Sequence, residues 1–346
     1  MKYKSEVDVG VLCLFFNRPE YFKQVFEQVR KARPSKLFLY QDGPRDGRND
    51  MPGILACRKI AENIDWDCEV HQNYLEKNQG CDPSGYLSRK WAFSYVDKCI
   101  ILEDDTVPSV SFFQFCRELL DRYENDVRVA MITGMNYEEV SEYCPYDYFF
   151  SEDMNIWGWA TWKRVVDNWE GDYSFIKDKY HMLLMAKYIK EAKLRNLIPM
   201  MKWHSESGKQ YFESIMLAYM YLNHSLCITP QKNLINNIGL TGGTHINIGL
   251  KGVPKGERPL YTMKRYELSF PLKHPKYMID NLYYKDATDK LLARCQPVKA
   301  WYRLQEARIR RVIIKVKSLF NKSGGGISYC PISVALQSVN LERRIA

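Results

Sequence analysis

The sequence has few of the features that mark membrane-spanning, disulfide-linked or repetitive proteins. Its longest apolar run, Val9–Phe16, spans eight residues, which is too short to cross a bilayer. No small-residue cleavage site follows this run, so we do not expect a secretory signal peptide. The ten cysteines include no C-x-x-C pair, and no internal repeat is visible. These absences favour a reducing, cytoplasmic environment over a disulfide framework.

The composition is that of a large globular protein with many aromatic side chains. The 346 residues are 46% hydrophobic, which is enough for one large α/β domain or two small ones. Aromatic residues make up 14% of the chain, including 24 Tyr and 8 Trp. Amphipathic rings suit a site that holds a partly polar ligand, but an aromatic-rich core would need them equally. The composition therefore leaves both interpretations open.

Positive charge is concentrated near the C-terminus. The whole chain carries +9, and residues 298–322 hold eight basic residues and one acidic residue, a net +7. The rest is close to neutral, so we do not expect a nucleic-acid-binding surface. Ile309, Ile313 and Val316 recur at helical spacing, which predicts a basic amphipathic helix. Such a helix suits peripheral contact with an anionic inner-membrane face, or packing on this chain or on a second copy.

The first 135 residues alternate between strand-like and helix-like patterns. Alternation at this spacing predicts an α/β fold with a mainly parallel sheet and helices on both faces. The expected strands cover residues 9–16, 36–40, 68–72, 98–102 and 129–133, and the expected helices cover 20–31, 54–63, 84–96 and 112–122.

Polar segments follow three of these strands directly. They contain Arg18, Asp42 and the acidic triplet Glu103-Asp104-Asp105. The C-terminal ends of parallel strands form one edge of a sheet, where ligands of open α/β sheets bind. We therefore expect the three segments to converge on one crevice.

The acidic triplet is the most informative motif, because it follows an apolar strand. Adjacent carboxylates repel one another, and a hard cation such as Mg²⁺ or Mn²⁺ removes that penalty. Such an ion takes one or two protein carboxylates and completes its shell with water and phosphate oxygens. The alternative is that an acid of the triplet caps the helix expected from residue 109 to 122, since Asp is favoured at helix N-termini.

The triplet resembles the E-D-D metal motif of GT-A fold glycosyltransferases, in particular the N-acetylglucosaminyltransferase I type and its bacterial relatives. The resemblance covers about residues 8–250. It implies that Asp105 holds the metal, and that Glu103 and Asp104 contact the nucleotide-sugar or the water ligands of the ion. It also implies the GT-A fold and a nucleotide-sugar donor.

Two segments of the nucleotide side carry the same resemblance. Phe16–Pro19 is similar to the family's C/N-x-R, which implies that Arg18 contacts the diphosphate or uridine; forked Arg donors suit phosphate oxygens. Tyr40–Gly43 is similar to the family's S-Q-D, which implies that Asp42 binds uracil. An Asp before Gly is also typical of an ordinary turn. A basic residue near the donor is expected on the helix over 84–96, as Arg89 or Lys90.

Two further segments resemble parts of the family that surround the donor sugar. The stretch from 155 to 162 is similar to the family's G-x-G-W, which implies that Gly158 and Trp159 line the donor-sugar pocket. An aromatic core cluster is the alternative. The stretch from 236 to 245 resembles a loop that orders over the donor, which would bring His245 to phosphate or metal. An ordinary flexible hairpin is the alternative there.

The candidate catalytic base lies in Tyr211–Met216, which resembles the family's W-D-D-W-M. Glu213 takes the place of the first acid, and Ser214 replaces the second. An inverting transfer needs one carboxylate to accept the proton of the attacking hydroxyl, which Glu213 would do. An exposed Glu at the start of a helix is the alternative.

The resemblance implies metal-dependent, inverting transfer from a UDP-sugar to a glycan or lipid-linked acceptor in cell-surface polysaccharide synthesis. Residues 1–275 would form the catalytic domain, with 1–135 binding the nucleotide and 136–275 the sugar and acceptor. A basic helical extension over 276–322 and a tail over 323–346 would follow. A nucleotidyltransferase is disfavoured because no glycine follows the first strand in 16–20. A non-catalytic carbohydrate-binding protein remains open.

Overall fold

The structure is a computed structural model. It describes residues 2–189, 191–240 and 249–294, and then residues 296, 298–299, 301–303, 305–306, 308–310 and 313. The predicted tail over 323–346 lies outside the described residues.

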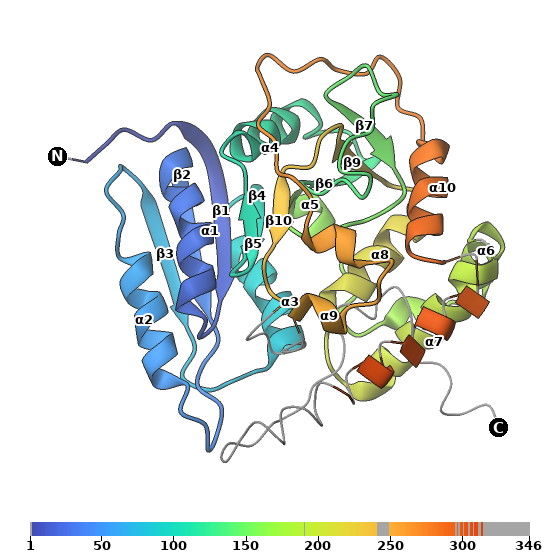
Figure 1. Ribbon diagram of the computed structural model, residues 1–346, viewed down its shortest axis with the longest axis horizontal. Helices are drawn as coiled ribbons and strands as arrows, with labels where there is room; N and C mark the ends of the chain where they lie inside the picture. The colour runs from blue at the N-terminus through green and yellow to red at the C-terminus, as the bar shows by residue number, and fades with distance from the viewer. Residues whose placement is uncertain are drawn as a thin grey trace.

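The N-terminal half forms four parallel strands in the order β3-β2-β1-β4. Crossovers between parallel strands are right-handed as a rule. Because α1 and α2 connect strands in one direction along the sheet and α3 connects back in the other, α1 and α2 lie on one face and α3 lies on the other. In Figure 1 this half is drawn in blue to cyan. The strands are β1 (Val7–Phe15), β2 (Pro34–Gln41), β3 (Glu69–Tyr74) and β4 (Lys98–Glu103), and the helices are α1 (Pro19–Ala32), α2 (Met51–Ala61) and α3 (Cys81–Ala92).

Helix α1 shows why the sequence forms these elements. Pro19 opens it with a preset backbone angle, and Glu20 in the first turn complements the positive end of the helix dipole. Phe22 and Val25 lie on its buried face. Arg33 ends it in the left-handed conformation, with φ of 48°. The helix predicted over 20–31 is therefore confirmed.

The sheet continues without a break into the second half. Strand β8 is antiparallel to β4 and β6, β9 is parallel to β6, and β7 is antiparallel to β9. The eight strands form one mixed, mainly parallel sheet, which confirms the predicted α/β class. The added strands are β6 (Val129–Thr133), β7 (Tyr148–Ser151), β8 (Trp159–Trp162) and β9 (Leu226–Pro230), and β5 (Thr106–Pro108) pairs separately with β10 (Ile235–Asn237).

Helices and one main core complete the domain. Fully buried residues from both halves, such as Leu12, Ile100 and Met216, belong to the same apolar cluster. The helices of this half are α4 (Ser111–Arg122), α5 (Lys163–Val166), α6 (Lys179–Tyr188), α7 (Glu191–Ser207), α8 (Phe212–Leu222), α9 (Gly249–Gly252) and α10 (Leu282–Leu291), with 3₁₀ turns η1 (Ser174–Lys177) and η2 (Arg258–Tyr261).

The acidic triplet does not cap helix α4, which corrects that alternative. The cap position is Val110, and strand β5 separates it from the triplet. The carboxylate of Glu267 accepts the backbone N–H groups of Val110 at 3.1 Å and of Ser111 at 2.7 Å. Because a distant residue supplies the cap, the triplet is left at the end of β4 without a helix-capping role.

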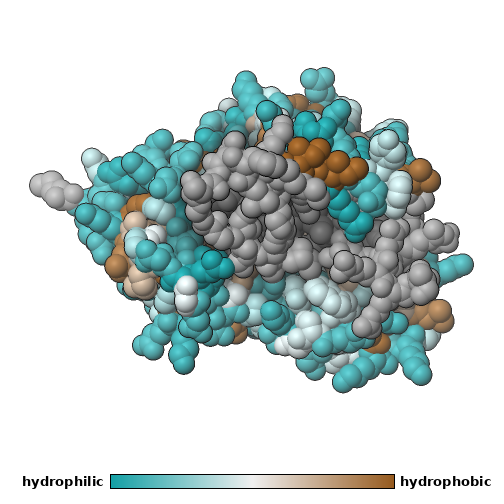
Figure 2. All heavy atoms as spheres, turned by 60° about the horizontal axis from the view of Figure 1, so that its bottom comes forward, coloured by the Kyte–Doolittle hydropathy of each residue, from teal (hydrophilic) through white to brown (hydrophobic). Residues whose placement is uncertain are grey.

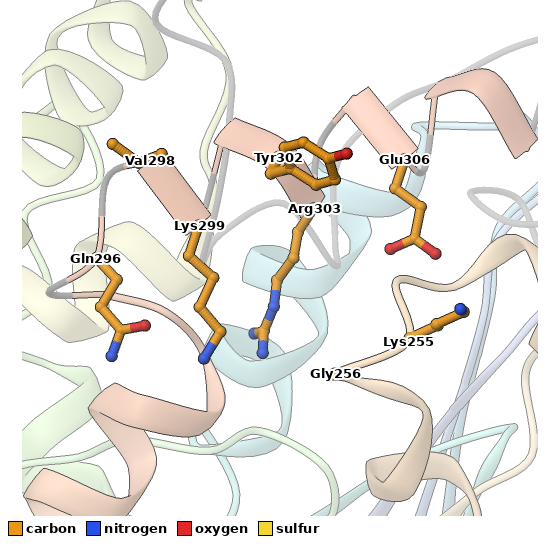
Figure 3. A pocket seen from close by; sticks show the side chains of 8 residues that line it. All are labelled: Lys255, Gly256, Gln296, Val298, Lys299, Tyr302, Arg303 and Glu306. Carbon is orange, nitrogen blue, oxygen red and sulfur yellow. The ribbon is translucent and has the colours of Figure 1, made fainter.

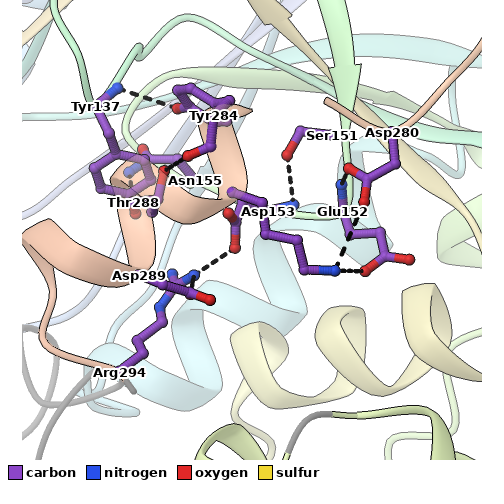
Figure 4. Close-up of polar contacts among 11 residues, drawn as sticks. Tyr137, Ser151, Glu152, Asp153, Asn155, Asp280, Tyr284, Thr288, Asp289 and Arg294 are labelled. Atoms are coloured by element: carbon purple, nitrogen blue, oxygen red, sulfur yellow. Dashed lines mark hydrogen bonds and ion pairs between the residues drawn. The ribbon is translucent and has the colours of Figure 1, made fainter. Parts of the chain in front are cut away.

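Buried polar contacts fix the start of the C-terminal extension to the sheet (Figure 4). The backbone N–H of Tyr137 donates to the hydroxyl of Tyr284 in α10 at 3.1 Å. Beyond α10, Arg294 pairs with Asp153 after β7 and, at 3.4 Å, with Asp289. Since a buried ion pair that loses one partner is costly, these contacts hold residues 282–294 in place.

No helix within the described residues is long and apolar enough to cross a membrane. The face shown in Figure 2 is hydrophilic over most of its described surface, with hydrophobic residues in small separate groups. Small groups of this kind are ordinary for a protein surface.

Candidate active site

The ends of β1, β2 and β4 lie at one edge of the sheet. In register, Phe15 of β1 is opposite Gln41 of β2, and Leu14 of β1 is opposite Glu103 of β4. The polar segments that follow these strands therefore start from neighbouring positions. This places Arg18 and the acidic triplet in direct contact.

Arg18 links two carboxylates of the triplet. Its Nη2 donates to Asp104 and, at 2.9 Å, to Oδ2 of Asp105, and its Nε donates to Oδ2 of Asp104 at 3.2 Å. Asp104 is only 5% exposed, so burial raises its pKa while the guanidinium opposes that shift. The repulsion expected within the triplet is thus offset by a cation whose donors also suit a diphosphate.

The donor set at this edge fits a hard cation that keeps few protein ligands. Within the described residues, no group of three or more His, Cys, Asp or Glu side chains could hold a metal ion. Asp104 and Asp105 offer carboxylate oxygens, and Mg²⁺-like ions commonly take one or two of these and fill the remaining positions with water and phosphate. The side chain of Asp105 is 14% exposed and is the more accessible of these two carboxylates.

The segment predicted to order over the donor begins directly against Asp105. The backbone N–H of Ile238 donates to the Asp105 carbonyl at 2.9 Å. A Cβ at Gly239 would lie 2.1 Å from Oδ2 of Asp105, so only glycine allows this approach. His245 lies outside the described residues, and its role stays a prediction.

Glu103 faces a different cation, the fully buried Arg89 of α3. Nη2 of Arg89 donates to Oε1 of Glu103 at 3.2 Å, and the guanidinium carbon lies 3.7 Å from the ring centroid of Phe212. Burial raises the pKa of Glu103, and Arg89 opposes the shift. Lys90 turns away and donates to the carbonyl of Val166 at 2.6 Å. Of the two basic residues left open by the sequence, Arg89 is the one in the site.

Glu213 follows Phe212 in the first turn of helix α8, close enough to Arg89 and Glu103 to interact with both charges. Burial raises the pKa of Glu213 to about 8, the negative charges of Asp82 and Glu103 add to this, and Arg89 opposes it. A carboxylate that binds protons this strongly near neutral pH has the property needed of a general base.

A buried polar network that the sequence did not reveal holds the first turn of α8. Oγ of Ser214 lies 2.8 Å from Nδ1 of His204 and 3.0 Å from the hydroxyl of Tyr173, which also accepts the backbone N–H of Tyr211 at 3.1 Å. Burial lowers the pKa of His204 to about 4, so its ring is neutral at pH 7. Because His204 lies in the preceding helix α7 and Tyr173 lies 38 residues before Tyr211, no motif within 211–216 could have signalled this support for Glu213.

Asp42 follows β2 at the same edge of the sheet and connects its own loop to the loop before α3. Its Oδ1 accepts the backbone N–H groups of Gly43 at 2.9 Å and Gln79 at 2.8 Å, and its Oδ2 accepts that of Gly80 at 3.0 Å. Burial raises its pKa, and these donors oppose the shift. The turn-forming role is therefore present and joins two loops, while contact with uracil stays a prediction.

Gly158 directly precedes the buried strand β8, which begins at Trp159. Gly158 has φ of 61°, and a Cβ there would lie 2.5 Å from Cδ1 of Ile235, so the position requires glycine. The indole of Trp159 is fully buried and stacks on Phe212 with 6.1 Å between ring centroids. This packing corresponds to the aromatic-core alternative. Direct contact between Trp159 and the donor sugar stays a prediction, and the full burial of the indole disfavours it.

Comparisons with known proteins found only distant similarity. No protein-family model and no curated protein matches the chain. Among solved structures, the chain is similar to the mannosyltransferase PcManGT of Pyrobaculum calidifontis in complex with GDP-Man and Mn²⁺, at 12% identity over 64% of this chain and 73% of that one, with a TM-score of 0.35. It is also similar to mouse xyloside xylosyltransferase 1 in its apo form, at 11% identity over 52% and 76%, with a TM-score of 0.30. At this level of similarity, the fold rests on the strand order given above.

Proposed function

We propose that this chain is a metal-dependent GT-A type glycosyltransferase that transfers a sugar from a nucleotide-sugar to a hydroxyl group. The observation that carries the proposal is the charge arrangement at one sheet edge. Arg18 bridges Asp104 and Asp105, and the buried Arg89 pairs with Glu103 close to Glu213. A phosphate-binding group, a candidate cation ligand and a candidate base are therefore neighbours in the fold.

On the donor side, Arg18 binds the diphosphate through its forked donors. Asp105 holds Mn²⁺ or Mg²⁺, with Asp104 and, if it reaches the site, His245 nearby. When bound, the ion stabilises the charge that develops on the leaving diphosphate. Asp42 selects UDP if one oxygen of its carboxylate leaves its backbone contacts in the loop and accepts a hydrogen bond from the uracil ring.

On the acceptor side, Glu213 accepts the proton of the acceptor hydroxyl as its oxygen attacks the anomeric carbon, with inversion. Arg89 fixes Glu103 toward the donor, and Phe212 and Trp159 cover Arg89 on the core side. Gly158 lets β8 approach β10 closely beneath the site. The acceptor is a glycan or a lipid-linked sugar, used in cell-surface polysaccharide synthesis at the inner membrane face.

Calorimetric titration with UDP, with and without Mn²⁺, tests the donor site. We expect Mn²⁺-dependent binding by the wild type, loss of that dependence in Asp105→Ala, and no change in Asp286→Ala, which removes an exposed carboxylate on α10. Parallel titrations with GDP and dTDP report which nucleobase the site prefers. Failure of all three nucleotides to bind would remove the transferase proposal and leave a carbohydrate-binding protein.

A further inference from the structure

A concave site lies between the segment that follows α9 and the helical residues beyond α10. It is a pocket of about 700 Å³, a size typical of small-ligand sites. One wall is the loop at Lys255 and Gly256, and the other includes the helical residues Val298, Lys299, Tyr302, Arg303 and Glu306 (Figure 3). Its lining is Lys255, Gly256, Gln296, Val298, Lys299, Tyr302, Arg303 and Glu306.

The residues that line the pocket carry an excess of positive charge, although most of the surface that they present to it is apolar. It is lined by Lys255, Lys299 and Arg303, and by one carboxylate, Glu306. Glu306 is already paired with Arg310 at 2.9 Å. In the described part of the chain, no ion pair joins the three lining cations to a carboxylate; Arg303 donates instead to the carbonyl of Leu291. Uncompensated like charges in a concave surface favour an anionic ligand.

Contacts with α10 and with the loop at Gly256 fix the position of the Arg303 side chain. Its contact with Leu291 ties it to the end of α10, which is itself anchored to the sheet. A Cβ at position 256 would lie 2.2 Å from Nη2 of Arg303, so the absence of a side chain at Gly256 makes room for the guanidinium. Figure 3 shows Lys299 and Arg303 extending in the same direction, with Arg303 ending beside Gly256.

The same pocket carries groups that suit a sugar. Tyr302 is 69% exposed and Val298 is 78% exposed, so an aromatic ring and an aliphatic side chain are available at the rim beside the cations. An exposed tyrosine offers a flat apolar face together with a hydroxyl, as pyranose rings require. Arg and Lys donors supply the charge-assisted hydrogen bonds that phosphate oxygens accept.

We propose that this pocket binds a phosphorylated sugar. The proposal concerns binding at a site separate from the sheet edge and does not depend on the transferase activity. The phosphate is held by Lys255, Lys299 and Arg303, and the sugar ring lies against Tyr302. The same phosphate chemistry is offered by a soluble sugar phosphate and by a phospholipid headgroup, and the experiment separates these two sources.

Calorimetric titration of the full chain with glucose 1-phosphate, in chelator, tests the proposal. The chelator keeps the metal-dependent donor site silent, and glucose is the uncharged control probe. We expect glucose 1-phosphate to bind and glucose to bind far more weakly. The double variant Lys255→Ala/Lys299→Ala should weaken binding by up to about 25-fold, because each exposed charge contact contributes up to about fivefold.

Three further variants separate this site from other causes. Lys251→Ala removes one lysine charge on α9, outside the pocket, and should bind like the wild type. Gly256→Ala keeps every charge but displaces the Arg303 guanidinium, and should weaken binding. Asp105→Ala should keep the binding of glucose 1-phosphate even if it loses the binding of UDP. The experiment can therefore refute either proposal without refuting the other.

A second arm uses vesicles of equal parts phosphatidylglycerol and phosphatidylcholine. Vesicle binding that the double lysine variant loses, without binding of glucose 1-phosphate, would assign the pocket to a lipid headgroup and overturn the sugar-phosphate assignment. The whole proposal is overturned if neither probe binds, or if the double lysine variant and Lys251→Ala lose binding equally.

Discussion

Arg89 offers the sharpest test of the site's electrostatics, through the substitution Arg89→Met. The side chain is fully buried, donates to Glu103 at 3.2 Å and covers the ring of Phe212 at 3.7 Å. Methionine fills similar volume without charge. The variant therefore removes one partner of an ion pair and leaves the packing largely filled.

The magnitude follows from the two partners. Losing one partner of a fully buried pair costs about 3–5 kcal/mol. The side chain of Glu103 is 35% exposed, so water can solvate part of its charge and the electrostatic loss is reduced. The lost cation–π contact adds about 1–2 kcal/mol. Together we expect unfolding free energy to fall by about 3 kcal/mol at pH 8.

The loss should depend on pH. Without Arg89, the folded pKa of Glu103, already raised by burial, rises further above its unfolded value. An acid with a raised folded pKa destabilises the fold when ionised, and this effect is relieved as the pH falls toward the unfolded pKa. The stability difference between wild type and Arg89→Met should therefore be smaller at pH 5 than at pH 8.

Urea unfolding at the two pH values measures this difference, with Lys90→Met as the matched control from the same helix. Activity gives a second measurement, because Arg89 also opposes the raised pKa of Glu213. The acid limb of the pH–rate profile should move to higher pH in Arg89→Met and partly return in Arg89→Lys. Equal stability losses at pH 5 and pH 8 would show that Arg89 acts by packing and refute the electrostatic account.

Three further predictions follow from the same geometry. Glu213→Gln should lower kcat by about 10²–10⁴-fold and leave UDP affinity unchanged, with Glu206→Gln on the exposed face of α7 as the control. The kcat of the wild type should rise as the pH increases through 8, as Glu213 loses its proton. Unaltered turnover in Glu213→Gln would remove the assignment of Glu213 as the general base. Wild-type stability should fall by about 3 kcal/mol from pH 6.5 to 4, since unfolded His204 takes up a proton that the folded form rejects, and a His204→Phe variant with the same pH dependence would contradict this. Gly158→Ala should destabilise the fold by about 1–3 kcal/mol through the clash with Ile235, Ile235→Val should recover part of that loss, and equal melting temperatures for Gly158→Ala and wild type would disprove the clash.

Local patterns in the sequence were sufficient for the elements of the N-terminal half. The strand predicted over 98–102 is β4 (Lys98–Glu103), and the helix predicted over 84–96 is α3, which starts and ends earlier, at Cys81–Ala92. Helix α3 starts after Gly80, whose positive φ of 90° precedes the first turn. Periodicity finds such elements because burial on one face repeats every 3.6 or 2 residues, whereas their ends depend on individual caps.

Some residues of the candidate site were located from the sequence, and others only from the structure. The sequence by itself determined that Arg18 and the acidic triplet stand at strand ends, because parallel strands share an edge. It could not choose between Arg89 and Lys90, which are adjacent on one helix and face different directions. Only the tertiary structure decided that Arg89 lies buried between Glu103 and Phe212, and that His204 supports the turn of Glu213. Those contacts join different helices and strands, and burial and the resulting pKa shifts exist only after the chain has packed.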